Sequence, residues 1–96
     1  MPQNDPRGET LRPFRCRSIT VRIELADFAE AMESKLRATD HKAHWSTVST
    51  TWLFGRLRQE LDELQEAFNY SEHAIREEAV DVANFCMMIF DKVKRQ

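Results

Sequence analysis

The chain has 96 residues and a formal net charge of -2, which limits it to one small domain and argues against a nucleic-acid polymer as its partner. Hydrophobic residues make up 42% and charged residues 31%, a balance that excludes a disordered chain and is typical of a soluble helical protein. No apolar run approaches the roughly 18 residues of a membrane span, and the polar N-terminus lacks the apolar core of a signal peptide. The two cysteines form no CxxC pair. We therefore expect a cytoplasmic protein with no membrane partner.

Residues 1–24 are predicted to be a flexible or extended segment that precedes a helical domain at residues 25–96. All three prolines lie in the first thirteen residues, which favours a flexible tail there. Ile19, Val21 and Ile23 alternate with polar residues as in a short strand. Such a lone strand is expected to have no partner within the chain. It would add to a neighbouring chain or extend across the bundle, and the sequence leaves it unassigned.

The first predicted helix covers residues 25–38 and ends at Thr39-Asp40. Its apolar residues recur at three- and four-residue spacing, as expected for one buried face: Phe28, Ala29, Met32 and Leu36. Residues 40–45 are predicted to form a loop. The next helix is expected to begin near Trp52, with Ser49, Thr50 or Thr51 as its N-cap.

Two further helices, at about residues 52–68 and 71–93, are predicted to form an antiparallel hairpin with its turn near Asn69–Ser71. Ser71 is the predicted N-cap of the last helix. The buried seam of the first is expected to comprise Leu53, Leu57, Leu61, Leu64 and Phe68, with Glu60 and Glu63 beside it. The last helix has its seam at Ile75, Ala79, Val82, Cys86, Ile89 and Val93, and it is apolar almost all round from Ala79 onward. A helix that is apolar on every side is buried on every side. The sequence thus predicts an all-α fold, a helical hairpin plus an N-terminal helix, whose four-helix-bundle-like core is completed by oligomerisation.

Each helix of the hairpin carries two acids three residues apart, Glu60 with Glu63 and Glu78 with Asp81. Acids at this spacing share one helix face, about 4.5 Å apart along the axis. A turn centred between Tyr70 and Ser71 sets Glu60 opposite Asp81 and Glu63 opposite Glu78. Four carboxylates would then converge between the helices, where like charges repel unless a cation lies among them.

Asp81 gives the strongest sign of a cation, because Val80 and Val82 flank it and buried carboxylates are rarely unpaired. It needs either a metal or a basic partner from elsewhere in the chain. An all-oxygen surround suits Mg²⁺, with Mn²⁺ as a substitute. A zinc site is not favoured, since His41, His44 and His73 have no cysteine partners, and no Glu-x-x-His pair of a di-iron protein is present.

The run Gln59-Glu60-Leu61-Asp62-Glu63, followed after fourteen residues by Glu78-Ala79-Val80-Asp81, resembles the ExxE…ExxD signature of the MazG-like, all-α nucleoside triphosphate pyrophosphohydrolases. The flanking run through Phe85 and the upstream Lys35-Leu36, Asp40-His41-Lys42 and Trp45 are also similar to that family. The resemblance covers about residues 27–93. It departs from the family at Gln59, where an acid is common, and this leaves the number of metal ions open.

The resemblance implies a dimer, or a dimer of dimers, that cleaves a (deoxy)nucleoside triphosphate to the monophosphate and pyrophosphate. The implied Mg²⁺ ligands are Glu60, Glu63, Glu78 and Asp81, with Glu60 as the residue that orients or deprotonates the attacking water. The expected substrate contacts are Lys42 and Arg58 to phosphate, Asn84 to the nucleotide, and Trp45 or Phe85 to the base. Two alternatives remain: a helical dimerisation or adaptor protein whose acids form a polar rim, and a nucleotide sensor that binds metal without turnover.

Overall fold

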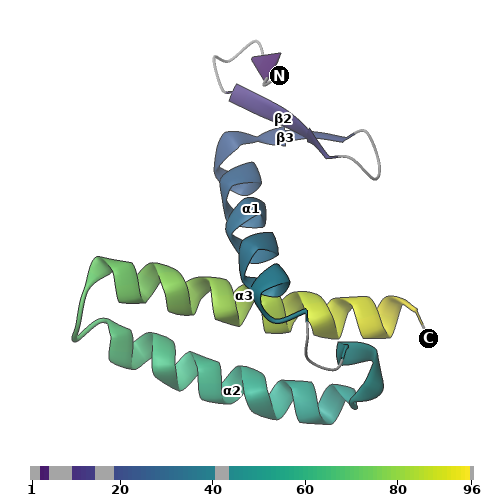
Figure 1. The fold of residues 1–96 in the computed structure, drawn as a ribbon, viewed down its shortest axis with the longest axis vertical. Helices are drawn as coiled ribbons and strands as arrows, with labels where there is room; N and C mark the ends of the chain where they lie inside the picture. Colours follow the sequence, from purple (N-terminus) through teal and green to yellow (C-terminus); the bar gives the residue numbers. More distant parts are fainter. Residues whose placement is uncertain (1–2, 5–9, 15–18, 41–43, 96) are drawn as a thin grey trace.

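Three helices account for most of the chain (Figure 1). The computed structural model describes residues 3–4, 10–14, 19–40 and 44–95. In it, α1 spans Ile23–Ala38, α2 spans Thr50–Ala67 and α3 spans Glu72–Lys94, while a short 3₁₀ helix, η1 (Trp45–Thr47), precedes α2. Helices α2 and α3 lie side by side and antiparallel, and α1 crosses α3 (Figure 1). The predicted all-α class is confirmed, and no described helix has the length and apolarity that a bilayer span requires.

The two hairpin helices begin at serine caps. The Ser49 hydroxyl accepts a hydrogen bond from the Trp52 amide, and the Ser71 hydroxyl accepts one from the Ala74 amide, each at 3.0 Å. Each bond satisfies one backbone N–H that a helix start otherwise leaves unpaired. The prediction of Ser71 as a cap is therefore confirmed, and Ser49 is the cap among the three candidates.

The N-terminal segment forms strands where the sequence predicted a flexible tail and an unpaired strand. Strands β1 (Gln3–Asn4), β2 (Thr10–Phe14) and β3 (Ile19–Arg22) make an antiparallel sheet in the order β1-β2-β3. The register of β2 on β3 runs from Leu11 opposite Arg22 to Phe14 opposite Ile19. The expectation that β3 has no partner in the chain was wrong, because β2 satisfies one of its edges. The sheet lies at the N-terminal end of α1, away from the hairpin (Figure 1).

The buried seam of α2 follows a seven-residue repeat through Leu53, Glu60 and Ala67. Leu57 and Leu64 of the predicted seam are half-buried. The prediction was wrong at Leu61 and Phe68, which are 47% and 68% exposed. Both lie one residue beyond the buried line. A seven-residue repeat keeps one line of side chains facing a partner helix. In α2 this line contains Glu60, and the neighbouring Leu61 lies outside it.

Helix α3 is buried through Val80 and Asn84, the face that packs on α2 and α1. The prediction that Cys86 and Val93 lie in its core was wrong: both are exposed. They project from parts of α3 that no other described helix of this chain covers.

The described chain leaves much apolar surface in contact with solvent. Its Cα radius of gyration is 15.3 Å, whereas a compact domain of this length has about 12.5 Å. The large exposed side chains include Phe28, Phe54, Phe68, Phe90 and Val93. The prediction that a second subunit covers such a surface stays a prediction.

The register of α2 can be tested with two leucines. We expect Leu53→Ala to lower the free energy of unfolding by about 2–5 kcal/mol, because Leu53 is 1% exposed and its loss leaves a cavity. Leu61→Ala removes the same atoms from an exposed site, so its effect should be within about 1 kcal/mol. Urea unfolding measures both. Equal losses would show that Leu61 is buried in solution and would contradict this register.

Candidate metal centre and adjoining pocket

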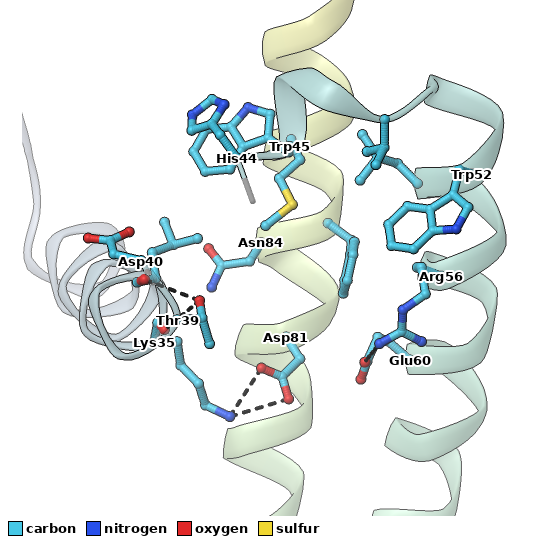
Figure 2. A pocket seen from close by; sticks show the side chains of 15 residues that line it. Lys35, Thr39, Asp40, His44, Trp45, Trp52, Arg56, Glu60, Asp81 and Asn84 are labelled. Carbon is cyan, nitrogen blue, oxygen red and sulfur yellow. Dashed lines mark hydrogen bonds and ion pairs between the residues drawn. The ribbon is translucent and has the colours of Figure 1, made fainter. Parts of the chain in front are cut away.

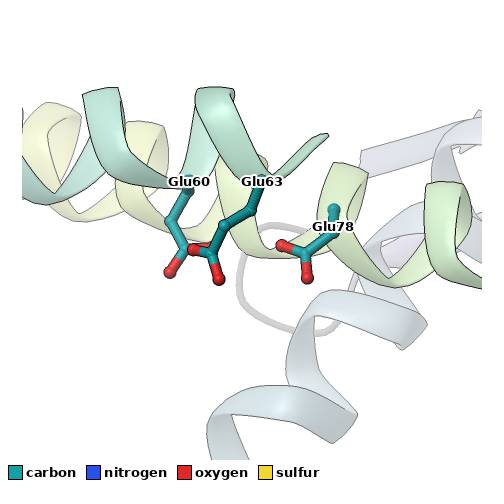
Figure 3. Close-up of side chains that lie close together, drawn as sticks. All are labelled: Glu60, Glu63 and Glu78. Carbon is teal, nitrogen blue, oxygen red and sulfur yellow. The ribbon is translucent and has the colours of Figure 1, made fainter. Parts of the chain in front are cut away.

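Three of the four predicted acids converge between α2 and α3. Glu60, Glu63 and Glu78 each place a carboxylate oxygen within 4.8 Å of the other two (Figure 3). Glu60 is buried, Glu78 is half-buried and Glu63 is exposed, so the cluster opens to solvent on one side. The two helices thus bring Glu63 and Glu78 together as their matched sequence positions predicted.

Glu60 lies inside the packed seam, whereas the sequence placed it beside the seam. It is 7% exposed, and one carboxylate oxygen accepts a hydrogen bond from Arg56 Nη2 at 3.0 Å. Burial is the largest cause that raises the pKa of Glu60, to about 7, and the nearby carboxyl groups of Glu63, Asp81 and Glu78 raise it further. A carboxyl group with a pKa near 7 exchanges a proton at neutral pH.

Asp81 does not join the three-carboxylate cluster, because Lys35 of α1 holds it. Lys35 Nζ lies 3.1 Å and 3.3 Å from the two carboxylate oxygens of Asp81 (Figure 2) and 2.9 Å from Glu77. The sequence required a metal or a distant basic partner for Asp81, and the structure supplies the basic partner. Sequence reasoning assigned Lys35 no role, because it lies 46 residues from Asp81 and only the crossing of α1 over α3 brings them together.

Arg56 is a second site residue that sequence reasoning missed. It bonds Glu60 and the Gln59 side chain, and its guanidinium lies 5.2 Å from the centre of the Phe85 ring. Its i, i+4 spacing from Glu60 was a signal that could have been read from the sequence. The predicted phosphate contact Arg58 is exposed and does not line the pocket described next.

A pocket of about 570 Å³ opens beside the acids, between α1, η1, α2 and α3 (Figure 2). Glu60, Arg56, Lys35 and Asp81 line its charged end. Its walls carry aromatic and aliphatic side chains: Trp45, Trp52, Phe85, Leu36, Val48 and Met88. Three of the predicted substrate contacts, Trp45, Asn84 and Phe85, line the pocket. Lys42 and Cys16 fall outside the described residues.

Trp45 is held in place at the rim of the pocket. Its Nε1 donates a hydrogen bond to Asp91 Oδ2 at 3.0 Å, and the bond from Trp45 is the largest cause that lowers the pKa of Asp91. The ring centres of Trp45 and His44 lie 3.9 Å apart. Since both neighbours hold the indole, Trp45 forms a fixed part of the wall.

Two buried oxygens have no hydrogen-bond partner among the described residues: Glu78 Oε2 in the acid cluster and Asn84 Oδ1 in the pocket wall. Buried polar atoms without a partner are costly and uncommon. Glu78 Oε2 lies among other carboxylates, where a cation would satisfy it. Asn84 lines the pocket, and an N–H donor would satisfy its Oδ1.

Comparisons with known proteins give few relatives. The sequence matches no family profile and no solved structure. It is 36% identical over 66 residues to an uncharacterized protein of Archaeoglobus fulgidus, covering 68% of this chain and 71% of that protein. It is also 28% identical over 91 residues to the E3 ubiquitin-protein ligase TRIM35 of Homo sapiens and of Pongo abelii. That match covers 95% of this chain but 18% of the length of either TRIM35 protein.

The buried Glu60 should make the fold less stable as the pH rises. Its pKa is about 7 in the folded chain against an ordinary value of 4.5, so the folded state keeps a proton that the unfolded state releases between these values. The free energy of unfolding should therefore fall between about pH 4.5 and 7, by at most about 3 kcal/mol, and the loss is complete above pH 7. Glu60→Gln should remove this fall and exceed the wild type in stability at pH 8, in buffer with EDTA.

Urea unfolding of both proteins from pH 4.5 to 8.5 measures this difference. Asp62→Asn is the matched control, because Asp62 is exposed on the same helix. Parallel stability curves for wild type and Glu60→Gln would contradict the buried position of Glu60.

Proposed function

This chain belongs to the same family as the uncharacterized protein of Archaeoglobus fulgidus, and we propose that it is a Mg²⁺-dependent nucleoside triphosphate pyrophosphohydrolase. It would convert a (deoxy)nucleoside triphosphate and water to the monophosphate and pyrophosphate, in sanitation or turnover of the cytoplasmic nucleotide pool. One observation carries the proposal: three carboxylates converge within 4.8 Å, and one of them, Glu60, also lines the charged end of a 570 Å³ pocket. That volume lies in the range of small-molecule sites, roughly 300–1,000 Å³.

The residues of the cluster fit a hard divalent cation. All the donors are carboxylate oxygens, which Mg²⁺ and Mn²⁺ prefer, and the buried Glu78 Oε2 has no other partner among the described residues. Glu60, Glu63 and Glu78 would hold the ion. Asp81 would join them after it exchanges Lys35 for the metal. When bound, the ion would supply the positive charge that neutralises phosphate oxygens during phosphoryl chemistry.

The side chains around the cluster can do the remaining chemistry. Glu60 would orient the attacking water or accept its proton, because it is the one acid of the cluster that also lines the pocket. Arg56 lines the pocket beside Glu60, and its guanidinium suits a phosphate group. Lys35, once released from Asp81, would be a second cation for the triphosphate.

The opposite end of the pocket suits a nucleobase. Trp45, Trp52 and Phe85 supply aromatic surface to it, and flat bases stack on such side chains. The distance between the charged end and the aromatic end is set by α2 and α3, which carry groups of both kinds. This division matches the chemistry of a nucleotide, with phosphates at one end and a ring at the other.

The first experiment measures pyrophosphate release from a panel of NTPs and dNTPs. We expect release with Mg²⁺ and none with EDTA. Glu78→Gln and Asp81→Asn should each lower kcat/KM by roughly a hundredfold or more, because each removes a charge that holds the metal. Asp62→Asn and Glu72→Gln neutralise exposed acids of α2 and α3 outside the cluster, so they should keep wild-type rates. If folded protein releases no pyrophosphate from any of these triphosphates, the proposal is overturned.

The exposed apolar surface supports a homo-oligomer, either a dimer or a dimer of dimers. Phe54, Phe68 and Phe90 are each more than half exposed, and apolar areas of this kind commonly mark interfaces. The same surface favours the alternative function, a helical dimerisation or adaptor protein. The TRIM35 match brings no ligase function to this chain, which corresponds to 18% of that protein.

Thermal melting with and without Mg²⁺ separates these functions. Under the proposed function, Mg²⁺ at 100 times its Kd should add about 2.7 kcal/mol to the free energy of unfolding and raise Tm, and Glu78→Gln should abolish the rise. An adaptor should show an oligomeric mass by light scattering and no change of Tm. A Mg²⁺-dependent rise without pyrophosphate release would instead indicate a nucleotide sensor.

A further inference from the structure

We propose that the aromatic end of the pocket selects a ring that carries an exocyclic amino group, which donates to Asn84 Oδ1. Among nucleobases, cytosine, adenine and guanine carry such a group, at C4, C6 and C2. The inference rests on the proposed function only in taking the ring to be that of a nucleotide. Its evidence is separate from the acid cluster.

Asn84 is fixed as an acceptor. The residue is 5% exposed, and its Nδ2 donates a hydrogen bond to the Met32 carbonyl of α1 at 3.2 Å. A flipped amide would place Oδ1 against that carbonyl, so that two acceptors would face each other. The bond to α1 therefore leaves Oδ1 as the free end of the amide, and Oδ1 has no partner among the described residues.

The wall around Asn84 offers further acceptors. Thr39 and Asp40, at the end of α1, line the same pocket (Figure 2). The Thr39 hydroxyl lies 3.2 Å from the Leu36 carbonyl and donates its proton to the helix, so its oxygen also faces outward as an acceptor. Asp40 contributes a carboxylate. A ligand that meets this side of the pocket must bring N–H donors.

The aromatic side chains restrict the donor to a flat ring. Trp45, Trp52 and Phe85 line the pocket together with Asn84, and Trp45 is held by Asp91 and His44. An amino group on such a ring would satisfy Asn84 Oδ1. A ring carbonyl at the same position would leave two buried oxygens facing each other without a proton, which costs free energy.

Access to Oδ1 requires a small rearrangement, because the atom has no solvent contact in the structure. Met88 lies one helical turn beyond Asn84 on the same face of α3 and lines the pocket. Its unbranched side chain adapts to a ligand at low cost. A shift of Met88 is the rearrangement that we expect when a ring edge enters between α1 and α3.

Deaminated pairs of nucleosides test the inference directly. Cytidine and uridine differ at the exocyclic position by an amino group against a carbonyl, and adenosine and inosine differ in the same way. Guanosine and xanthosine form a third such pair, which differs at C2. Both tryptophans of the chain line the pocket, so intrinsic fluorescence reports binding without a label. In EDTA, we expect cytidine, adenosine or guanosine to quench the fluorescence with an affinity at least about tenfold higher than its deaminated partner.

Variants then assign the preference to the amide. Asn84→Leu should reduce the amino-over-carbonyl ratio to within about twofold. Met87→Leu, a volume-conserving change on the same helix outside the pocket lining, should keep that ratio. If Asn84→Leu does not fold, the wild-type pairs decide alone. Equal affinities within all three pairs, or no quenching by any of the six nucleosides, would overturn the inference.

The outcome separates the two proposals. Preferential binding of an amino nucleoside with no pyrophosphate release from any triphosphate would retain this inference and overturn the hydrolase. Pyrophosphate release with equal binding of amino and deaminated partners would retain the hydrolase and overturn this inference.

Discussion

A carboxyl group in the packed seam between α2 and α3 is the constraint on which the rest of this structure depends. The seam repeats every seven residues, and Glu60 occupies the position between Leu53 and Ala67 where a heptad pattern normally places an apolar side chain. Burial and neighbouring acids raise its pKa to about 7, so the helix pair carries an electrostatic cost at neutral pH. Arg56 satisfies one oxygen of the group, while Glu63 and Glu78 add charge of the same sign. A cation bound between these carboxylates would replace their mutual repulsion with attraction and would stabilise the hairpin.

The small core explains why the hairpin tolerates such a group at all. Among the described residues the buried apolar side chains are Ala26, Leu53, Ala67 and Val80, of which only Leu53 is large. Alanines at a helix contact allow close approach but bury little area. The stability of the isolated chain therefore depends on few contacts. Larger apolar groups such as Phe54 and Phe90 remain in solvent, available to a second surface.

Local patterns predicted the helices well because their signals are local. Ser49 and Ser71 cap α2 and α3 as sequence rules suggest, and the matched spacing of the acids brought Glu63 and Glu78 together. The predicted seam of α2 passed through Leu61, whereas the buried residue is its neighbour Glu60. Hydrophobicity alone favours the leucine. The burial of Cys86 was predicted wrongly for a related reason. On a helix that is apolar all round, the sequence does not tell which face packs against the partner helices. Lys35 and the strand pairing of β3 depend on contacts between distant parts of the chain, which no local pattern contains.

Helix α1 links the two ends of the pocket through residues spaced at three and four positions along one face. Met32 accepts the Asn84 amide, Lys35 holds Asp81, and Thr39 lies against the aromatic end. Asp81 and Asn84 are one turn apart on α3. Adjacent turns of α1 therefore contact the charged end and the aromatic end of the pocket. A shift of α1 along α3 would release Asp81 toward the other acids and at the same time free the amide of Asn84 from its fixed orientation. The position of α1 therefore affects two features at once. It sets whether Asp81 is free to join the other acids, and whether Asn84 presents an acceptor at the aromatic end.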